Sequence, residues 1–295
     1  MSRFLLVLHP RSNGTLHNHL IFFCVMETPF YLSIPSAKTI MVCGDIHGEF
    51  NLLVYKLCIQ YKMRDTLLIV AGDCGFGFEK PEYYKSIVKK NSARMSRANN
   101  WIVFVRGNHD NPAYFDGKAF AYKRFIAVPD YAVIQASGRT ILGVGGGISI
   151  DRMYRIQKWK EYYCRYKGFL HLPDKSPFAR NLYWENEPPV YDETLLESVG
   201  KKFSIDAVVT HSAPAFCELT SKNMLVHFAQ KDPELLCDVQ KERGTMELLF
   251  HKLIDCGHPL SNWYYGHFHQ SWNAIISGVR FKMLDIMEFA EIRPL

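Results

Sequence analysis

Three short apolar runs in the sequence each lead into a glycine that is followed by Asp or Asn. The runs are Thr39–Cys43, Thr66–Ala71 and Trp101–Val105. Apolar residues at helical spacing in residues 50–63, and a proline at the start of the polar segment 81–99, predict one helix between each pair of runs. This order predicts parallel strands with right-handed crossovers and covering helices. It also places the polar residues just beyond the carboxyl ends of the strands.

In the second half of the chain, strands and helices no longer alternate, and the order of the short strands predicts a second sheet. Short strands are expected at residues 124–128, 131–135, 140–144, 206–209, 263–265, 274–276 and 279–285, and a helix at 234–256. Residues 151–200 do not fit, because they combine many aromatic and charged residues with four prolines. We interpret them as an insertion near the mouth of the site. The chain as a whole is predicted to be α/β (α+β), with two facing sheets and helices outside them.

Five segments carry side chains that bind metal ions. They are Gly-Asp-Ile-His-Gly at 44–48, Gly-Asp at 72–73, Gly-Asn-His-Asp at 107–110, Thr-His at 210–211 and Gly-His-Phe-His at 266–269. The candidate ligands are Asp45, His47, Asp73, Asn108, His211, His267 and His269. This mixed oxygen and nitrogen set suits a pair of divalent transition metals better than calcium or a thiolate zinc site. Core histidines and turn aspartates are the alternative, and five such segments together disfavour it.

In this order the segments resemble the calcineurin-like metallophosphoesterase family, and the resemblance spans roughly residues 39 to 285. It implies a double-layered β-sandwich flanked by helices. It also implies that Asp73 bridges two metal ions. One metal ion would be held by Asp45, His47, Asp73 and His269, and the other by Asp73, Asn108, His211 and His267.

The expected reaction is hydrolysis of a phosphomonoester or phosphodiester. Two dications about 3.5–4 Å apart lower the pKa of a bridging water and clamp the attacking and leaving oxygens, so a metal-bound hydroxide is the expected nucleophile. His109 is expected to protonate the leaving alkoxide or to stabilise the transition state, and Asp110 to orient the imidazole. Manganese, iron, zinc and nickel all suit these ligands.

Two arginines are candidates for contact with the substrate. Arg106 precedes the Gly-Asn-His-Asp segment, where the serine/threonine protein phosphatase branch of the family has a phosphate-binding arginine. Arg152 follows a Gly145-Gly146-Gly147 stretch that we interpret as a strand-end turn approaching the cleft.

Two alternative functions stay open. A phosphoprotein phosphatase is favoured by Arg106, but the second motif lacks the Asp-Arg pair of that branch, and Asp110 stands where that branch has Glu. A non-catalytic scaffold is disfavoured by the complete ligand set.

Composition limits the cellular setting and the partners. The formal net charge of +6 favours an anionic phosphate ester but is too small to indicate nucleic acid. The eight cysteines form no Cys-x-x-Cys pair, which favours free thiols and a cytoplasmic location. The sequence has no apolar run of the roughly 18–20 residues that a membrane span needs.

The domain organisation is predicted from the positions of the motifs. We expect one domain at 39–290 with its insertion at about 151–200, preceded by an extension at 1–38. We hypothesise that translation naturally starts at Met26 and that residues 1–25 are an upstream addition. The oligomeric state is left open by the sequence.

Overall fold

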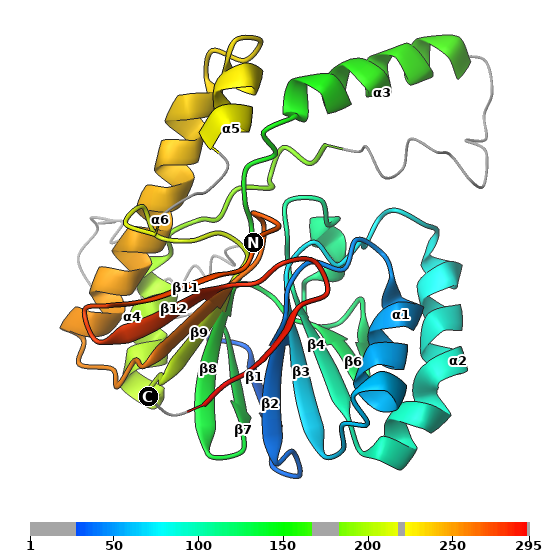
Figure 1. Ribbon diagram of the computed structural model, residues 1–295, viewed down its shortest axis with the longest axis vertical. Coiled ribbons are helices and arrows are strands. Elements are labelled where there is room, and N and C mark those ends of the chain that lie inside the picture. Colours follow the sequence, from blue (N-terminus) through cyan, green and yellow to red (C-terminus); the bar gives the residue numbers. More distant parts are fainter. Residues whose placement is uncertain (1–27, 167–182, 218–221, 294–295) are drawn as a thin grey trace, which may run out of the picture.

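The apolar runs form two β-sheets that lie face to face, with helices on both outer sides (Figure 1). The computed structural model describes residues 28–166, 183–217 and 222–293. Met26 and the rest of residues 1–27 lie outside them. The predicted two-layered β-sandwich flanked by helices is therefore confirmed.

The first sheet has six strands in the order β13-β2-β3-β4-β6-β5, and its central strands are parallel. Every residue of β3 is buried, because the sheet is covered on both faces. The strands are β2 (Thr39–Cys43), β3 (Thr66–Ala71), β4 (Trp101–Val105), β5 (Ala121–Tyr122), β6 (Phe125–Ala127) and β13 (Phe289–Glu291).

The second sheet has seven strands in the order β1-β7-β8-β9-β10-β12-β11. Tight turns at Ser137-Gly138 and Ser277-Gly278 have left-handed backbone at both positions and close the β7–β8 and β11–β12 hairpins. The strands are β1 (Tyr31–Ile34), β7 (Ala132–Ala136), β8 (Arg139–Val144), β9 (Ala207–Thr210), β10 (Asn262–Tyr265), β11 (Trp272–Ile276) and β12 (Val279–Met283).

The helices complete the layers. In Figure 1, α1 (Phe50–Tyr55) and α2 (Pro81–Ala98) cover the six-stranded sheet, and α4 (Glu193–Lys202) and α6 (Leu235–Asp255) cover the other. A π-helical turn at Lys56–Gln60 continues α1. The helices α3 (Arg152–Tyr166) and α5 (Lys222–Ala229) lie at the upper end of the molecule in that view.

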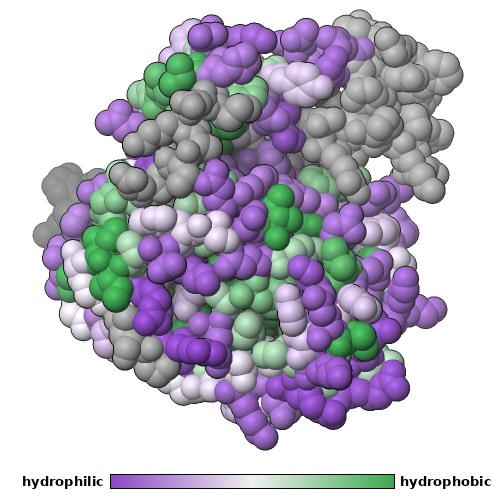
Figure 2. Space-filling view, viewed as in Figure 1, coloured by the Kyte–Doolittle hydropathy of each residue, from purple (hydrophilic) through white to green (hydrophobic). Residues whose placement is uncertain are grey.

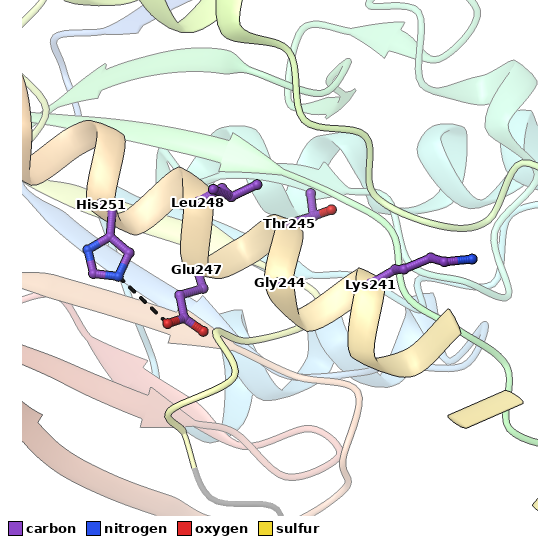
Figure 3. Close-up of a pocket in the computed structure, with 6 residues that line it drawn as sticks. All are labelled: Lys241, Gly244, Thr245, Glu247, Leu248 and His251. Atoms are coloured by element: carbon purple, nitrogen blue, oxygen red, sulfur yellow. Dashed lines mark ion pairs between the residues drawn. The ribbon is translucent and has the colours of Figure 1, made fainter. Parts of the chain in front are cut away.

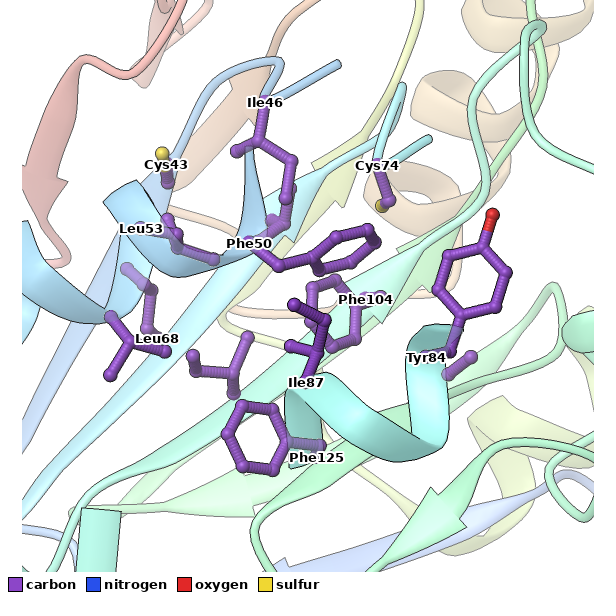
Figure 4. Close-up of a cluster of buried hydrophobic side chains, with 14 of the residues drawn as sticks. Cys43, Ile46, Phe50, Leu53, Leu68, Cys74, Tyr84, Ile87, Phe104 and Phe125 are labelled. Atoms are coloured by element: carbon purple, nitrogen blue, oxygen red, sulfur yellow. The ribbon is translucent and has the colours of Figure 1, made fainter. Parts of the chain in front are cut away.

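An aromatic cluster fixes the loop that follows β3. The ring of Phe76 is fully buried and packs 5.3 Å from the rings of both Phe50 and Phe104 (centroid to centroid). Figure 4 shows Phe50 of α1, Phe104 of β4 and Tyr84 of α2 in this cluster, with Cys74 at its edge. Because Asp73 lies only three residues before Phe76, the core holds the backbone that carries it.

The face of the molecule seen in Figure 2 is largely polar. In Figure 2 hydrophilic residues cover most of the visible face, and hydrophobic residues appear in small separate groups. Among the residues described, no helix has the length and apolar character needed to cross a membrane. Six cysteines in the described part of the chain are free thiols.

Several elements differ from the sequence prediction. The helix expected at 50–63 is α-helical only to Tyr55. The insertion at 151–200 contains α3 and most of α4. Asp192 caps the start of α4 by accepting a hydrogen bond from the backbone N–H of Leu195. The aromatic and proline content of the insertion obscured these helical patterns. Strand β1 lies within the predicted extension 1–38, yet it pairs in parallel with β7, so the sheet begins before residue 39.

Candidate metal centre

All seven predicted ligands meet at one end of the two sheets. Asp45, Asp73 and Asn108 follow β2, β3 and β4, while His211 follows β9 and the pair His267 and His269 follows β10. Parallel strands bring their carboxyl ends to the same edge, so segments more than 200 residues apart become neighbours. The seven side chains therefore lie together beyond the strand ends.

One half of the centre faces solvent. Ligand atoms of Asp45, His47, Asp73 and His269 all lie within 4.8 Å of one another, so these residues can hold a metal ion. The side chain of His269 is 44% exposed and that of His47 is 28% exposed. We call Asp45, His47 and His269 the open half.

The other half is enclosed by protein. The Asn108 Oδ1 atom lies 2.8 Å from His211 Nε2, and an Asp73 carboxylate oxygen lies 3.3 Å from the same nitrogen. The ring of His267 packs against that of His211, with 4.8 Å between their centroids. We call Asn108, His211 and His267 the buried half, since Asn108 and His211 are almost inaccessible. Asp73 lies between the two halves.

The hydrogen-bonding pattern fits a cation in the buried half. The Nδ1–H of His211 donates to the backbone carbonyl of Ala71 over 2.8 Å, so in the neutral ring the lone pair is on Nε2. That lone pair, the amide oxygen of Asn108 and the Asp73 carboxylate then converge as three acceptors, an arrangement that a dication satisfies. In the open half, the His47 and His269 Nε2 atoms face each other at 3.0 Å in the same way.

Glycines in four of the five ligand segments are required by close packing. A Cβ atom on Gly72 would collide with the ring of His211, and one on Gly107 would collide with the backbone of Asp73. We expected the glycines to supply tight turns, but Gly107 does not have a left-handed backbone. Its missing side chain instead lets the ligand segments approach one another.

Four ligands have a left-handed backbone themselves. The φ angles are +42° at His47, +44° at Asp73, +70° at His267 and +50° at His269. This conformation is unfavourable for residues with a Cβ atom, and it occurs where surrounding structure enforces it, often at functional sites. It turns these side chains toward a common point.

The predicted catalytic histidine lies beside the shared carboxylate. The His109 Nε2 atom is 3.7 Å from Asp73 Oδ2, and the His109 backbone N–H donates to Asp73 Oδ1 over 2.9 Å. Burial lowers the pKa of His109 to about 4, and the nearby guanidinium of Arg155 acts in the same direction while Asp73 opposes it. The imidazole is therefore neutral near pH 7.

Asp110 has a different partner from the one expected. We expected it to orient the His109 imidazole, but its carboxylate accepts hydrogen bonds from the backbone N–H groups of Cys74, Gly75, Phe76 and Gly107. These distances are 2.7–3.0 Å. Asp110 thus ties the turn after β4 to the turn after β3, because those N–H groups need a buried acceptor.

Neither predicted substrate arginine is directed at the ligands. The buried guanidinium of Arg106 pairs with Asp130 at 3.0 Å and donates to the backbone carbonyls of Asn186 and Glu187. Arg152 pairs with Asp232 and with Asp238, at 2.5 and 2.8 Å. Carboxylates and carbonyls close in space, but distant in sequence, draw both side chains away.

The residues that support the buried half were not predicted from the sequence. The Asn108 amide donates to Ser149 Oγ over 2.9 Å, and this hydroxyl donates to the carboxylate of Glu187 over 2.6 Å. A second buried carboxylate, that of Glu242, accepts from the backbone of Ile148 and from the hydroxyl of Ser212. The strand-end turn at Gly145-Gly146-Gly147 lies beside the buried half, since a Cβ atom on Gly147 would lie 3.2–3.4 Å from His211, His267 and Asn108.

These two glutamates are buried. Burial raises the pKa of Glu187 to about 8, with Glu242 and Asp73 adding to the effect and the Ser149 hydrogen bonds opposing it. Burial also raises the pKa of Glu242 to about 7. The available sequence signal was only a Glu between an aromatic run and two prolines, which predicts no particular contact.

A separate shallow groove of about 500 Å³ lies along α6 (Figure 3). An ion pair between His251 and Glu247, 3.7 Å long, spans part of it. None of the predicted site residues lines this groove, whose walls come from Lys241, Gly244, Thr245, Glu247, Leu248 and His251.

The chain resembles known phosphatases. Its match to the serine/threonine-protein phosphatase 6 catalytic subunit of Caenorhabditis elegans is 23% identical over 195 residues, covering 60% of this chain and 55% of that relative. Among solved structures, the protein TT1561 of Thermus thermophilus is similar with 12% identity and a TM-score of 0.48, covering 85% of this chain and 90% of that one. A dimetal phosphatase from Danio rerio is similar with 13% identity and a TM-score of 0.42, covering 86% and 88%.

A family match settles the relationship. The sequence model of the calcineurin-like phosphoesterases matches residues 38–244, which is more than half of the 295 residues. The matched range contains Asp45, Asp73, Asn108 and His211, while His267 and His269 follow it. The chain therefore belongs to the calcineurin-like phosphoesterase family.

Proposed function

We propose that the protein is a metal-dependent hydrolase of phosphate esters. The convergence of Asp45, His47, Asp73 and His269 within 4.8 Å carries this proposal. In it, these four residues hold one divalent ion, and Asp73 together with Asn108, His211 and His267 holds a second. Two such ions, when bound, supply an activated water and charge stabilisation for in-line displacement at phosphorus.

His109 is assigned the proton transfer to the leaving group. Its Nε2 atom lies near Asp73 and is neutral at pH 7, so it does not repel a metal ion. A bound phosphate adds negative charge beside the ring and raises the pKa of the imidazole. His109 can then hold a proton at Nε2 and pass it to the departing oxygen.

The substrate is a phosphomonoester or a phosphodiester in this proposal. A phosphoprotein phosphatase is the second candidate, favoured by the likeness to the Caenorhabditis elegans subunit. The arginine expected to bind phosphate in that case is Arg106, whose guanidinium is buried against Asp130 and the 186–187 carbonyls. We therefore favour a small phosphate ester.

The free cysteines favour a cytoplasmic location.

A screen with reconstituted protein tests the proposal. Manganese, iron, zinc and nickel are each added to metal-free protein, and the metal content is measured together with hydrolysis of phosphomonoesters, linear and cyclic diesters, nucleotides and a phosphopeptide. We expect two ions per chain and turnover of at least one small ester. A protein that binds no metal and hydrolyses nothing would instead support a scaffold, and exclusive turnover of the phosphopeptide would support the second candidate.

A further inference from the structure

A third arginine, Arg155, lies beside the metal centre, unlike Arg106 and Arg152. Arg155, one turn into α3, has an Nη2 atom 3.2 Å from Nε2 of His109. Its side chain is only 10% exposed. Because a guanidinium has donors and no acceptor, this contact uses an Arg155 N–H and the lone pair of the imidazole. The same Nε2 atom lies 3.7 Å from the carboxylate of Asp73, so the guanidinium and the residue between the two halves both contact one nitrogen of His109.

The position of this guanidinium is fixed by its own helix. Arg155 Nε donates to the carboxylate of Asp151 over 2.7 Å, and the Arg155 backbone N–H donates to the Asp151 carbonyl over 3.1 Å. The start of α3 is anchored in turn by Arg152, through Asp232 and Asp238. These contacts orient the guanidinium before any ligand arrives, which reduces the entropy lost on binding.

The three arginines differ in what their guanidinium groups face. Arg106 faces Asp130 and backbone carbonyls, and Arg152 faces two carboxylates. Among the residues that the structure describes, Arg155 contacts the carboxylate of Asp151 and the predicted proton donor His109. An anionic oxygen is a stronger acceptor for an arginine N–H than a neutral imidazole nitrogen. A phosphate at the metal centre would therefore displace His109 as the partner of Nη2.

We propose that Arg155, positioned by Asp151, binds a non-bridging oxygen of the substrate phosphoryl group and makes the enzyme selective for phosphomonoesters. This inference rests on the proposed function. A monoester near neutral pH carries two negative charges and three non-bridging oxygens, whereas a diester carries one charge and two such oxygens. An additional fixed cation therefore favours the monoester.

The test compares variants of the full, manganese-loaded chain. Arg155→Ala, Arg155→Lys and Asp151→Asn are assayed with 4-nitrophenyl phosphate and bis(4-nitrophenyl) phosphate. Binding of inorganic phosphate is measured separately by calorimetry, and metal content by mass spectrometry. Lys160→Ala, which removes an exposed cation from the same helix, is the matched control. Circular dichroism checks that each variant is folded.

We expect Arg155→Ala to lower kcat/KM for the monoester by about 100-fold and phosphate affinity by about 10-fold or more, with a clearly smaller loss on the diester and two metal ions retained. Arg155→Lys keeps the charge without the planar fork and should retain part of the activity. The activity of Asp151→Asn should lie between those of Arg155→Ala and Arg155→Lys. Lys160→Ala should behave as wild type.

Two results would overturn the assignment. Equal losses on both esters with unchanged phosphate affinity would mean that Arg155 acts only through His109. If the Arg155→Ala enzyme is as active as wild type, Arg155 has no role in binding the substrate. Failure of the proposed function looks different, because wild type would then hydrolyse neither ester. Phosphate affinity that still depended on Arg155 in such an inert protein would support the binding assignment by itself.

Discussion

The two halves of the metal centre use similar ligands in opposite surroundings. In the open half, His47 and His269 are 28% and 44% exposed at their side chains. In the buried half, His211 is fully enclosed and held by Ala71, while Asn108 is held by Ser149. Residues of the same types can therefore serve as metal ligands whether or not neighbouring loops hold their side chains in place. The open half has two partly exposed histidines beside the buried Asp45, which accepts a hydrogen bond from the backbone N–H of His267. The buried half is supported in addition by the loop that carries Ser149.

Asp73 belongs to both halves, so its replacement should have the largest effect. Asp73→Asn keeps the size of the side chain but removes the charge next to both sets of ligands. We expect both metal ions to be lost and ester hydrolysis to fall by about 10³-fold or more. Metal content and steady-state rates measure this. Asp255→Asn, at the exposed end of α6, is the control and should be unchanged. Retention of one tightly bound ion would show that the halves are independent.

Replacing one histidine from each half tests the difference in support. His211→Ala leaves the Ala71 carbonyl without its donor and opens a buried cavity, so the metal-free protein should lose about 2–3 kcal/mol of unfolding free energy. His269→Ala removes an exposed side chain and should change stability by less than about 0.5 kcal/mol. Both variants should lose activity. Urea unfolding provides the stabilities, and equal losses would contradict the distinction between the halves.

The support of the buried half should also respond to pH. The pKa of Glu187 is about 8 in the folded protein and near 4.5 in the unfolded chain, so the folded state binds more protons between these values. The stabilising contribution is complete below about pH 4.5 and is lost as pH rises through about 8. In metal-free protein, Glu187→Gln should reduce this fall by about 2 kcal/mol. Glu185→Gln, exposed and two residues away, should leave the slope unchanged.

The smallest effect is expected on metal affinity in one half. Glu187→Gln weakens the chain that orients the Asn108 amide, and support of this kind changes metal affinity by about 10-fold. We expect the affinity of one ion per chain to fall while the other is unaffected. Competition with a fluorescent chelator resolves the two constants. A change shared equally by both ions would mean that Glu187 supports the whole centre.

The sequence reveals the ligands of both halves because their chemistry is a matter of residue type and strand order. Asp45, Asp73 and Asn108 each follow an apolar run, and parallel pairing brings such positions together. The alternation of strands and helices in the first part of the chain was predictable for the same reason. The boundaries of β2, β3 and β4 coincide with the apolar runs because these strands are buried on both faces.

The support of the site could not be predicted in the same way. The orientation of Arg106 depends on Asp130 and on carbonyls 80 residues later in the chain, and no local pattern specifies such a contact. Asp110 and Glu187 show the same limit, since their partners are backbone groups and hydroxyls supplied by folding. The proposed role of Arg155 could not be predicted, because it lies in the polar, aromatic segment that we interpreted only as an insertion near the mouth of the site.

The left-handed backbone at four of the ligands has a consequence for how this protein can change. Each such residue is disfavoured by about 1 kcal/mol relative to glycine. Substitutions that destroy the centre, such as His47→Gly or His269→Gly, therefore remove a conformational penalty while abolishing metal binding. Selection for thermal tolerance alone would erode the site, and selection for turnover must continually oppose that drift. The best-folding version of this chain and the best catalyst are different sequences.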